Sequence, residues 1–253
     1  MPGRLAGKVA IVTGAARGQG EREARLFAAE GARVMLTDVL DVELKSAAED
    51  IGDAARFMHH DVSDEDDWTA VVATTVDAFG RLDVLVNNAA IHHVVPIEHE
   101  TVADFQRIVS VNLLGTFLGI RSVIGAMRGS GGGSIVNISS LAGVRGYPGH
   151  SSYAASKWGV RGVTQVAAVE LGGDGIRINS VHPGMIDTAM LPVDPRGNLE
   201  ARLAQVPLHR IGTTDDVASL VLFLASDESS YLSGAEITID GGSAAGRPAV
   251  SRE

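Results

Sequence analysis

Tyr153 and Lys157 are four positions apart in the stretch SSYAASKWG (151–159), a spacing that places both side chains on one face of a helix. A free tyrosine has a pKa of about 10, which is too high for a good base near neutral pH. A lysine ammonium group one helical turn away favours the phenolate, which can accept a proton from an alcohol. The Y-x-x-x-K spacing also occurs by chance in many proteins, so the pair alone does not separate a catalytic function from a shared helix face.

A glycine-rich segment, TGAARGQG (13–20), follows the apolar stretch VAIVT (9–13). Glycines permit a tight turn and a close approach of the backbone to a pyrophosphate, and the helix after them points its N-terminus at that charge. A glycine-rich turn without a ligand is the alternative, but a position between a strand and a helix favours dinucleotide binding. The loop residues that we expect at the cofactor are Gly14, Arg17, Gly18, Gln19 and Gly20.

Asp38 bears on the choice between the two nicotinamide dinucleotides. It ends the predicted strand RVMLTD (33–38), where a carboxylate can accept hydrogen bonds from the ribose diol of NAD and repels the 2′-phosphate of NADP. Arg17 argues in the opposite direction, because a guanidinium in the glycine loop can pair with that phosphate. Arginines are also common on protein surfaces without a phosphate partner, whereas placing a carboxylate next to a phosphate is directly unfavourable because both are negatively charged. The sequence therefore predicts NAD as the cofactor.

Short apolar runs alternate with helix-patterned stretches along the chain, and this order predicts an α/β fold whose parallel sheet is covered by helices on both faces. The predicted strands are 9–13, 33–38, one within 55–62, 82–87, 134–139, 177–182 and 236–240. The predicted helices are 18–30, 42–51, 64–79 with Ser63 as N-cap, 102–127 with Thr101 as N-cap, 152–171 and 214–226. The run GSGGGS (129–134) is interpreted as a helix-to-strand turn, so one domain over residues 1–253 is expected.

Several polar residues follow predicted strands, at the carboxyl edge of the sheet where such folds bind ligands. Asp61 and Val62 end the third strand, where the edge and face of an adenine ring would lie; a helix-capping acid and a core valine are the alternatives. Asn88 leaves the fourth strand, although asparagines at such positions usually serve turns. Ser140 follows the fifth strand, although a serine at a strand end is commonly structural.

The following motifs occur in one order over the whole chain: TGAARGQG, Asp38, NNAA (87–90), Asn112, Ser139-Ser140, Tyr153 with Lys157, and PGMIDT (183–188). Together they resemble the short-chain dehydrogenase/reductase family, and stretches such as SSYAASKWGVRGV look most similar to its bacterial hydroxysteroid dehydrogenases. Ala90 departs from the family pattern, which usually has glycine there, and one added methyl group is expected to be tolerated. The resemblance implies a Rossmann-type, doubly wound sheet of about seven strands. It also implies a homotetramer with the helices at about 102–127 and 152–171 in one interface.

The same resemblance implies roles for individual residues. Tyr153 exchanges a proton with the alcohol or ketone, and Ser140 hydrogen-bonds the substrate oxygen. Lys157 tunes Tyr153 and also holds the nicotinamide ribose. Asn112 anchors a water that links Lys157 to solvent, although an asparagine inside a helix is most often a backbone or packing contact.

Loop residues are expected to complete the site, by contacting the nicotinamide and by forming the substrate pocket. By the same resemblance Ile186 and Thr188 fix the nicotinamide carboxamide, although Thr188 could simply cap a helix. The substrate pocket is expected from residues 92–96 and 141–150 and from a substrate loop at about 185–210. These segments are mainly apolar and suit a steroid, a terpenoid or another alicyclic alcohol. Three arginines nevertheless leave an acidic substrate open: Arg196, Arg202 and Arg210.

The predicted function is that of an oxidoreductase that transfers a hydride between NAD(H) and a hydrophobic secondary alcohol or ketone, such as a hydroxysteroid or another alicyclic compound. An NADPH-dependent 3-oxoacyl reductase is one alternative, and it requires Asp38 to tolerate a 2′-phosphate. A dinucleotide-binding sensor without turnover is another. The complete set of Ser140, Tyr153 and Lys157 argues against the sensor.

Composition argues against several other classes of protein. The 253 residues carry a net charge of −10, which disfavours a nucleic-acid-binding surface, and they include no cysteine, which excludes thiolate chemistry and favours a reducing compartment. The N-terminal MPGRLAGK lacks the apolar segment of a signal peptide, and no apolar run reaches the ~18 residues of a membrane span. A cytoplasmic protein without membrane or nucleic-acid partners is expected. The eight histidines show no metal-ligand spacing, so no catalytic metal is expected.

Overall fold

One parallel sheet of seven strands organises the chain, in the order β3-β2-β1-β4-β5-β6-β7. The computed structural model describes residues 3–191 and 199–246. The strands are β1 (Val9–Thr13), β2 (Arg33–Asp38), β3 (Ala55–His59), β4 (Val84–Asn87), β5 (Gly133–Ile138), β6 (Ile176–Pro183) and β7 (Glu236–Ile239). The strand order reverses between β1 and β4, and ligands of such sheets bind at this switch point, beyond the carboxyl ends of the strands. The predicted fold class is confirmed.

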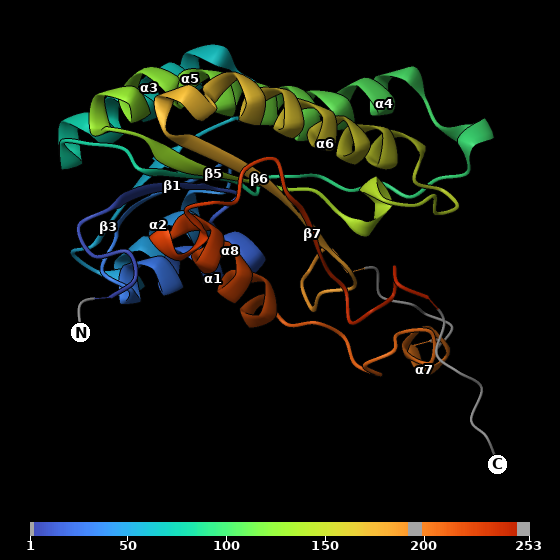
Figure 1. Cartoon of the computed structure of the whole chain (residues 1–253). Helices are drawn as coiled ribbons and strands as arrows, with labels where there is room; N and C mark the ends of the chain where they lie inside the picture. Colours follow the sequence, from blue (N-terminus) through green and yellow to red (C-terminus); the bar gives the residue numbers. More distant parts are fainter. Residues whose placement is uncertain (1–2, 192–198, 247–253) are drawn as a thin grey trace.

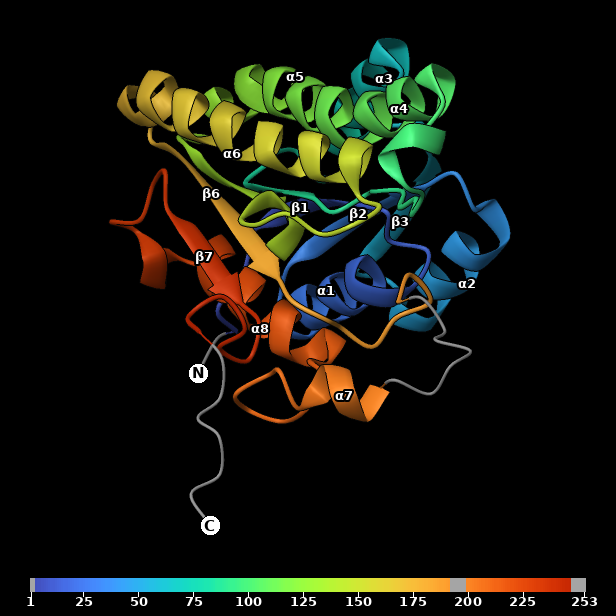
Figure 2. The same ribbon diagram turned by 90° about the vertical axis from the view of Figure 1, so that its right-hand side faces the viewer.

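Two layers of helices cover the sheet (Figure 1). Helices α1, α2 and α8 lie on one face, and α3, α4, α5 and α6 lie on the other, as the second view also shows (Figure 2). Their bounds are α1 (Gly18–Ala29), α2 (Asp41–Ile51), α3 (Glu65–Phe79), α4 (Val102–Val109), α5 (Gly115–Ser130), α6 (Ser151–Leu171) and α8 (Thr214–Ala225). The short helix α7 (Leu199–Leu203) lies outside both layers.

The first strand serves both layers because alternate side chains of a strand point to opposite faces. Ala10 and Val12 pack in the core that includes Phe27 of α1. Val9 and Ile11 pack in the second core, with Trp68 of α3. A strand that is buried on both faces has a continuous apolar sequence, which is why VAIVT carries no polar alternation.

Most predicted elements agree with the structure at their ends to within one or two residues, but the predicted N-cap of α3 is wrong. Asp64, not Ser63, caps this helix, and its carboxylate accepts hydrogen bonds from the backbone N–H groups of Asp66 and Asp67. A carboxylate at this position also interacts favourably with the positive end of the helix dipole. The predicted cap of α4 is confirmed, since Thr101 accepts a hydrogen bond from the N–H of Asp104.

The long helix predicted over 102–127 is not α-helical throughout. A π-helical turn, η2 (Ser110–Leu114), separates α4 from α5 and adds a residue to the helical path. Taken as one helix, Val102–Ser130 is long and apolar enough to cross a membrane, although it contains no uninterrupted apolar run of that length. In the structure α5 packs against β4 and β5, and 44% of the most apolar 18-residue stretch of this helix is buried inside the protein.

Candidate active site

Tyr153 and Lys157 lie one turn apart on the buried face of α6, as their spacing predicted. Their exposed fractions are only 8% and 2%. The Nζ atom of Lys157 donates a 2.8 Å hydrogen bond to the carbonyl oxygen of Ile138, the last residue of β5, and lies 5.7 Å from the centre of the Tyr153 ring. The helix that carries the candidate acid is therefore attached to the carboxyl end of the sheet.

Ser140 stands between the end of β5 and the candidate acid. Its hydroxyl oxygen accepts a hydrogen bond from the N–H of Ala142 at 3.1 Å and so caps the short 3₁₀ helix η3 (Leu141–Gly143). The Ser140 side chain is also near enough to Tyr153 to act on the pKa of its hydroxyl. The structure therefore brings Ser140, Tyr153 and Lys157 together, and Ser140 has a structural contact in addition to its place in the site.

Burial controls the ionisation of this pair. Burial raises the pKa of Tyr153, and the hydrogen bond with Ser140, which acts in the opposite direction, is the smaller effect. Burial also lowers the pKa of Lys157 to about 7, so this lysine is only partly charged at neutral pH. The protein by itself does not stabilise the phenolate in the way the spacing suggested. Ionisation of Tyr153 requires additional positive charge in the site.

Asn112, in the π-helical turn η2, is fully buried and joins three segments. Its Oδ1 accepts from the N–H of Ile91 at 2.9 Å, and its Nδ2 donates to the Ile91 carbonyl oxygen at 3.0 Å. Nδ2 also donates to the hydroxyl of Ser156, the neighbour of Lys157 on α6, at 3.2 Å. Through these bonds Asn112 connects the loop after β4 with the helix that carries the candidate acid, and its role toward a water stays a prediction.

The glycine loop folds tightly against the end of β4. A Cβ atom on Gly20 would lie 2.3 Å from the carbonyl oxygen of Gly14, and one on Gly14 would lie 2.8 Å from the Cα of Ala89. Only glycine fits at these two contacts. Within the described part of the chain, Nε2 of Gln19 is buried without a hydrogen-bond partner, which leaves a polar group free for a ligand. Arg17 is exposed at the start of α1.

Asn88 attaches this loop to the fourth strand. Its Nδ2 donates to the carbonyl oxygens of Thr13 at 3.0 Å and Gly14 at 3.2 Å. The Thr13 hydroxyl in turn accepts from the backbone N–H groups of Asn88 and Ala89, both at 3.0 Å. Thr13 was not among the predicted site residues. Its signal in the sequence is a hydroxyl at the end of a buried strand, directly before the first glycine of the loop.

Asp38 is held by backbone N–H groups from two segments. One carboxylate oxygen accepts from Ala16 in the glycine loop at 3.1 Å. The other accepts from Val39 at 2.8 Å and from Leu40 at 3.1 Å. A negative charge is therefore fixed next to the glycine loop at the end of β2, where the sequence placed it.

The sequence predicted Asp61 and Val62 at the end of the third strand, but β3 ends at His59 and both residues lie just beyond it. Val62 has the core contacts of its alternative, whereas Asp61 does not cap α3. The Asp61 carboxylate accepts from both the backbone N–H and the hydroxyl of Ser63, and these bonds hold its pKa below the usual value. Val62 is only 7% exposed and belongs to a core cluster. Its carbonyl oxygen accepts from the indole N–H of Trp68 at 2.9 Å.

The loop after β6 returns to the glycine loop. Ile186 is buried and forms a parallel bridge with Gly212, while a Cβ atom on Gly18 would come within 3.8 Å of Cγ2 of Thr188. The two predicted carboxamide contacts thus lie on the segment that covers the cofactor loop. Residues 192–198 of the predicted substrate loop, with Arg196, lie outside the described residues.

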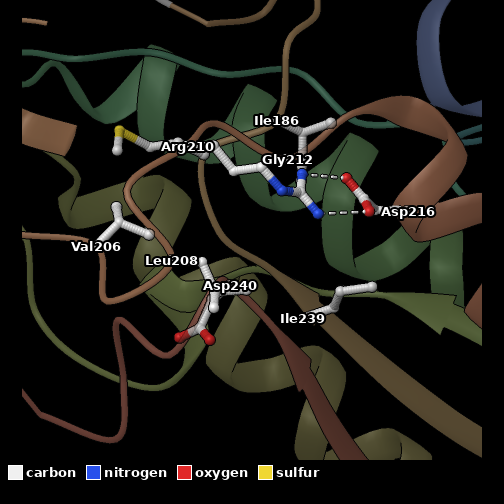
Figure 3. Close-up of a pocket in the computed structure, with 10 residues that line it drawn as sticks. Ile186, Val206, Leu208, Arg210, Gly212, Asp216, Ile239 and Asp240 are labelled. Atoms are coloured by element: carbon white, nitrogen blue, oxygen red, sulfur yellow. Dashed lines mark hydrogen bonds and ion pairs between the residues drawn. The ribbon is translucent and has the colours of Figure 1, made fainter.

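The base of the substrate loop encloses a pocket of about 90 Å³ (Figure 3). Its apolar lining includes Ile186, Val206 and Leu208. Arg210 at this pocket forms two hydrogen bonds with the carboxylate of Asp216, at 2.7 and 2.9 Å, which Figure 3 draws as dashed lines. Arg210 is therefore occupied by an internal ion pair, which weakens the case for an acidic substrate at this residue.

Comparisons with known proteins agree with this geometry. A family model described as enoyl-(acyl carrier protein) reductase matches residues 14–244. The 3-alpha-(or 20-beta)-hydroxysteroid dehydrogenase of Mycobacterium tuberculosis is 49% identical over 246 residues, which cover 97% of this chain and 93% of that protein. The chain belongs to the short-chain dehydrogenase/reductase family. The resemblance seen in the sequence, including that to the bacterial hydroxysteroid dehydrogenases, is confirmed.

Two further relatives of this family cover nearly the whole chain. The trans-4-hydroxycyclohexanecarboxylate dehydrogenase of Sinomonas cyclohexanicum is 45% identical, over 96% of this chain and 95% of that protein. The crystal structure of levodione reductase has a TM-score of 0.91 at 38% identity and covers 95% of this chain and 99% of that one. As a member of the family, the chain is an oxidoreductase that acts on CH–OH groups.

The residues present fit the nicotinamide dinucleotide that the family uses. The glycine contacts leave no room for side chains in the loop, and the buried amide of Gln19 offers a polar group there. Among the described residues, no three His, Asp or Glu side chains are grouped as a metal site. Ala90, the departure from the family pattern, has no positive φ, because His209 is the one non-glycine residue with that backbone in the described ranges.

Two histidines surround Tyr153 and were predicted only as members of the pocket segments. The ring of His92 meets the Tyr153 ring edge-on at 4.6 Å between centroids, and the ring of His150 lies 5.0 Å from His92. Burial, together with the neighbouring His150, lowers the pKa of His92 to about 4. His92 is therefore neutral at physiological pH and adds polarity but no charge next to the candidate acid.

Proposed function

We propose that this chain is an NAD(H)-dependent dehydrogenase of hydrophobic secondary alcohols that carry a ring, such as hydroxysteroids or other alicyclic alcohols. The observation that carries the proposal is the placement of Tyr153 and Lys157 one turn apart on the buried face of α6, with Ser140 directly after β5 near Tyr153. All three lie at the carboxyl edge of the sheet, on the same edge as the glycine loop.

In the proposed mechanism, Tyr153 accepts the proton of the alcohol as hydride leaves the carbinol carbon, and returns it in the reverse direction. Ser140 hydrogen-bonds the substrate oxygen, and Lys157 holds the nicotinamide ribose. The bound dinucleotide would accept or donate the hydride and, when oxidised, would supply positive charge. Such charge is what Tyr153 requires, because its burial disfavours the phenolate.

Asp38 supports NAD rather than NADP. Its carboxylate is held in place by three backbone N–H groups, so it cannot easily turn away from a 2′-phosphate. The exposed Arg17 has the freedom to pair with such a phosphate, but a fixed charge next to the ribose outweighs a mobile side chain at the surface.

The proposed substrate class rests on the apolar segments around the site and on the relatives. Leu141 and Ala142 are buried beside Ser140, and Val94 and Met190 are exposed on the neighbouring loops. The names of two relatives refer to a steroid and to a cyclohexane ring. A hydrophobic ring compound is therefore the substrate that the site supports best.

A homotetramer is the proposed assembly, and the cytoplasm is the proposed location. An apolar hollow on the outer face of α4, η2, α5 and α6 supports the assembly. It is lined by Val109, Leu113, Leu114, Phe117, Gly159, Gly162 and Val163. Phe117 is 44% exposed there, and an unpaired apolar face of this kind is typical of an interface. Light scattering of wild type and Phe117→Asp tests the assembly, which should dissociate in the variant.

A panel of ring-bearing alcohols, ketones and 3-oxoacyl thioesters, assayed with NAD(H) and NADP(H), tests the function. We expect turnover of alicyclic or steroid substrates with NAD(H), and its loss in Tyr153→Phe. Preference for 3-oxoacyl thioesters with NADPH would support the reductase alternative. Tight NAD binding without turnover of any compound would support the sensor.

A further inference from the structure

The catalytic helix begins without a cap from its own sequence. The N-cap residue of α6 is His150, and in the described residues its side chain makes no hydrogen bond to the helix. Its Nδ1 lies instead 2.8 Å from the carbonyl oxygen of Pro148. The first N–H groups of a helix have no partner within it, so they need one from elsewhere. Tyr153 is the third residue of α6, so its position depends on how this first turn is held.

Glu100 supplies the missing partner from a distant part of the chain. Its carboxylate accepts a hydrogen bond from the backbone N–H of Ser152 at 3.2 Å and another from the hydroxyl of Ser151. These contacts span 51 and 52 residues of sequence. They place a carboxylate at the N-terminus of the helix, directly before the residue proposed to move the proton.

The segment that carries Glu100 is itself fixed. The next residue, Thr101, caps α4, and the backbone N–H of Val95 donates to the carbonyl oxygen of Gly149 at 2.9 Å. The second carboxylate oxygen of Glu100 is buried and unpartnered among the residues that the structure describes. Burial acts to raise the pKa of Glu100, but the hydrogen bonds from Ser151 and Ser152 outweigh it and hold this pKa below its usual value. The side chain is therefore ionised at neutral pH.

We infer that Glu100 is a positioning residue for Tyr153, which it holds in place by capping the first turn of the catalytic helix. It acts through Ser151 and Ser152 and does not contact the reacting atoms. The kinetic part of this inference rests on the proposed function, whereas the effect on Tyr153 itself does not.

The carboxylate has a second consequence, because it stands at the positive end of the helix. That end favours the phenolate of Tyr153, and a negative charge beside it acts against the phenolate. The other titratable groups that face Tyr153 are His92, His150 and Lys157, and His93 lies near Glu100. None of these side chains is altered by a substitution at Glu100.

Glu100→Gln and Glu100→Ala separate the geometric effect from the charge. Glutamine keeps an acceptor oxygen for Ser151 and Ser152, so we expect it to retain kcat within about twofold. Alanine removes the cap, so we expect kcat to fall about tenfold with little change in KM. The matched control is Glu98→Gln on the same loop, an exposed side chain whose closest ionic partner is His99 at 3.9 Å.

Ultraviolet titration of the tyrosines gives a readout without turnover. The chain has three tyrosines, and Tyr153→Phe identifies the signal of Tyr153. Glu100→Gln should lower the pKa of Tyr153 by about 0.2 to 0.7 pH unit. The acidic limb of the pH profile of kcat should move down by the same amount. Glu98→Gln should change neither quantity.

A wild-type kcat in Glu100→Ala would overturn the positioning role of Glu100, and an unchanged Tyr153 titration in Glu100→Gln would overturn the effect of its charge. Equal loss of kcat in both variants would also overturn the positioning role. If the wild type turns over no alcohol or ketone, the proposed function fails, while the titration still decides whether the charge of Glu100 acts on Tyr153.

Discussion

Lys157 donates through Nζ to the carbonyl oxygen of Ile138 at 2.8 Å, which joins the catalytic helix to the end of the fifth strand. Lys157→Met keeps the apolar stem and removes both the donor and the charge. We predict that turnover falls at least about 10²-fold, because Lys157 is the proposed tuning group of Tyr153 and the proposed contact of the cofactor ribose. Steady-state kinetics measure the effect, and circular dichroism confirms that the variant is folded. Turnover within tenfold of the wild type would contradict the assignment.

Tyr153→Phe removes only the hydroxyl group of the proposed acid. The ring remains to pack against His92, so the fold should be preserved. We predict that kcat falls by roughly 10² to 10⁴, the usual contribution of an acid–base group. Dinucleotide affinity, measured by fluorescence titration, should stay within a few-fold of the wild type. Near-normal activity in this variant would contradict the proposed mechanism.

Asp38→Asn removes the fixed charge at the end of β2 but keeps an oxygen that can accept from Ala16. The repulsion of a 2′-phosphate then disappears. We predict that the ratio of NADPH to NADH affinity rises about tenfold, which corresponds to about 1.4 kcal/mol. Fluorescence titration with both cofactors measures this ratio, and the control is Asp41→Asn, at the exposed first residue of α2. An unchanged ratio would show that Asp38 does not select the cofactor.

Glu23 on α1 is fully buried, and neither of its carboxylate oxygens has a hydrogen-bond partner in the described ranges. Burial raises its pKa to about 8, so between its unfolded value of about 4.5 and pH 8 the folded state holds a proton that the unfolded state has released. The free energy of unfolding therefore falls as the pH rises through this window, by at most about 5 kcal/mol in total.

Glu23→Gln does not titrate, so its stability relative to the wild type should increase between pH 5 and pH 8. Urea unfolding at the two pH values measures this difference. Glu21→Gln is the control, because Glu21 lies on the same helix in an ion pair with Arg25. If the free energy of unfolding of Glu23→Gln differs from that of the wild type by the same amount at both pH values, the prediction is contradicted.

Local patterns were sufficient to predict the strands and helices, because a strand buried on both faces and an amphipathic helix each leave a short-range signal. The ends of helices were harder to predict where two neighbouring residues can both serve as the N-cap. In the stretch VSDEDDW both Ser63 and Asp64 can cap a helix, and the choice of Asp64 leaves Ser63 free to bond Asp61. The π-helical turn leaves no local signal, because Asn112 makes its side-chain bonds with Ile91 and Ser156.

The residues of the candidate site that form a sequence motif were predicted. Those that act singly, on partners far away in the sequence, were missed. The residues Ser140, Tyr153 and Lys157 come together as expected. Thr13 and Glu100 were not predicted, since a threonine before a glycine and a glutamate before a helix are common. Their partners lie 51 to 76 residues away in the sequence, and only the folded chain brings them into contact.

The bonds between Thr13 and Asn88 also bear on the order in which the protein is assembled during synthesis. The glycine loop leaves the ribosome before the residues that hold it, which follow 75 positions later. Closing a segment of this length costs entropy before any contact repays it, so the loop stays without its anchors until β4 has joined β1. A growing chain therefore becomes able to bind a dinucleotide only after the centre of the sheet has formed. From that point, cofactor binding stabilises the completed fold by mass action.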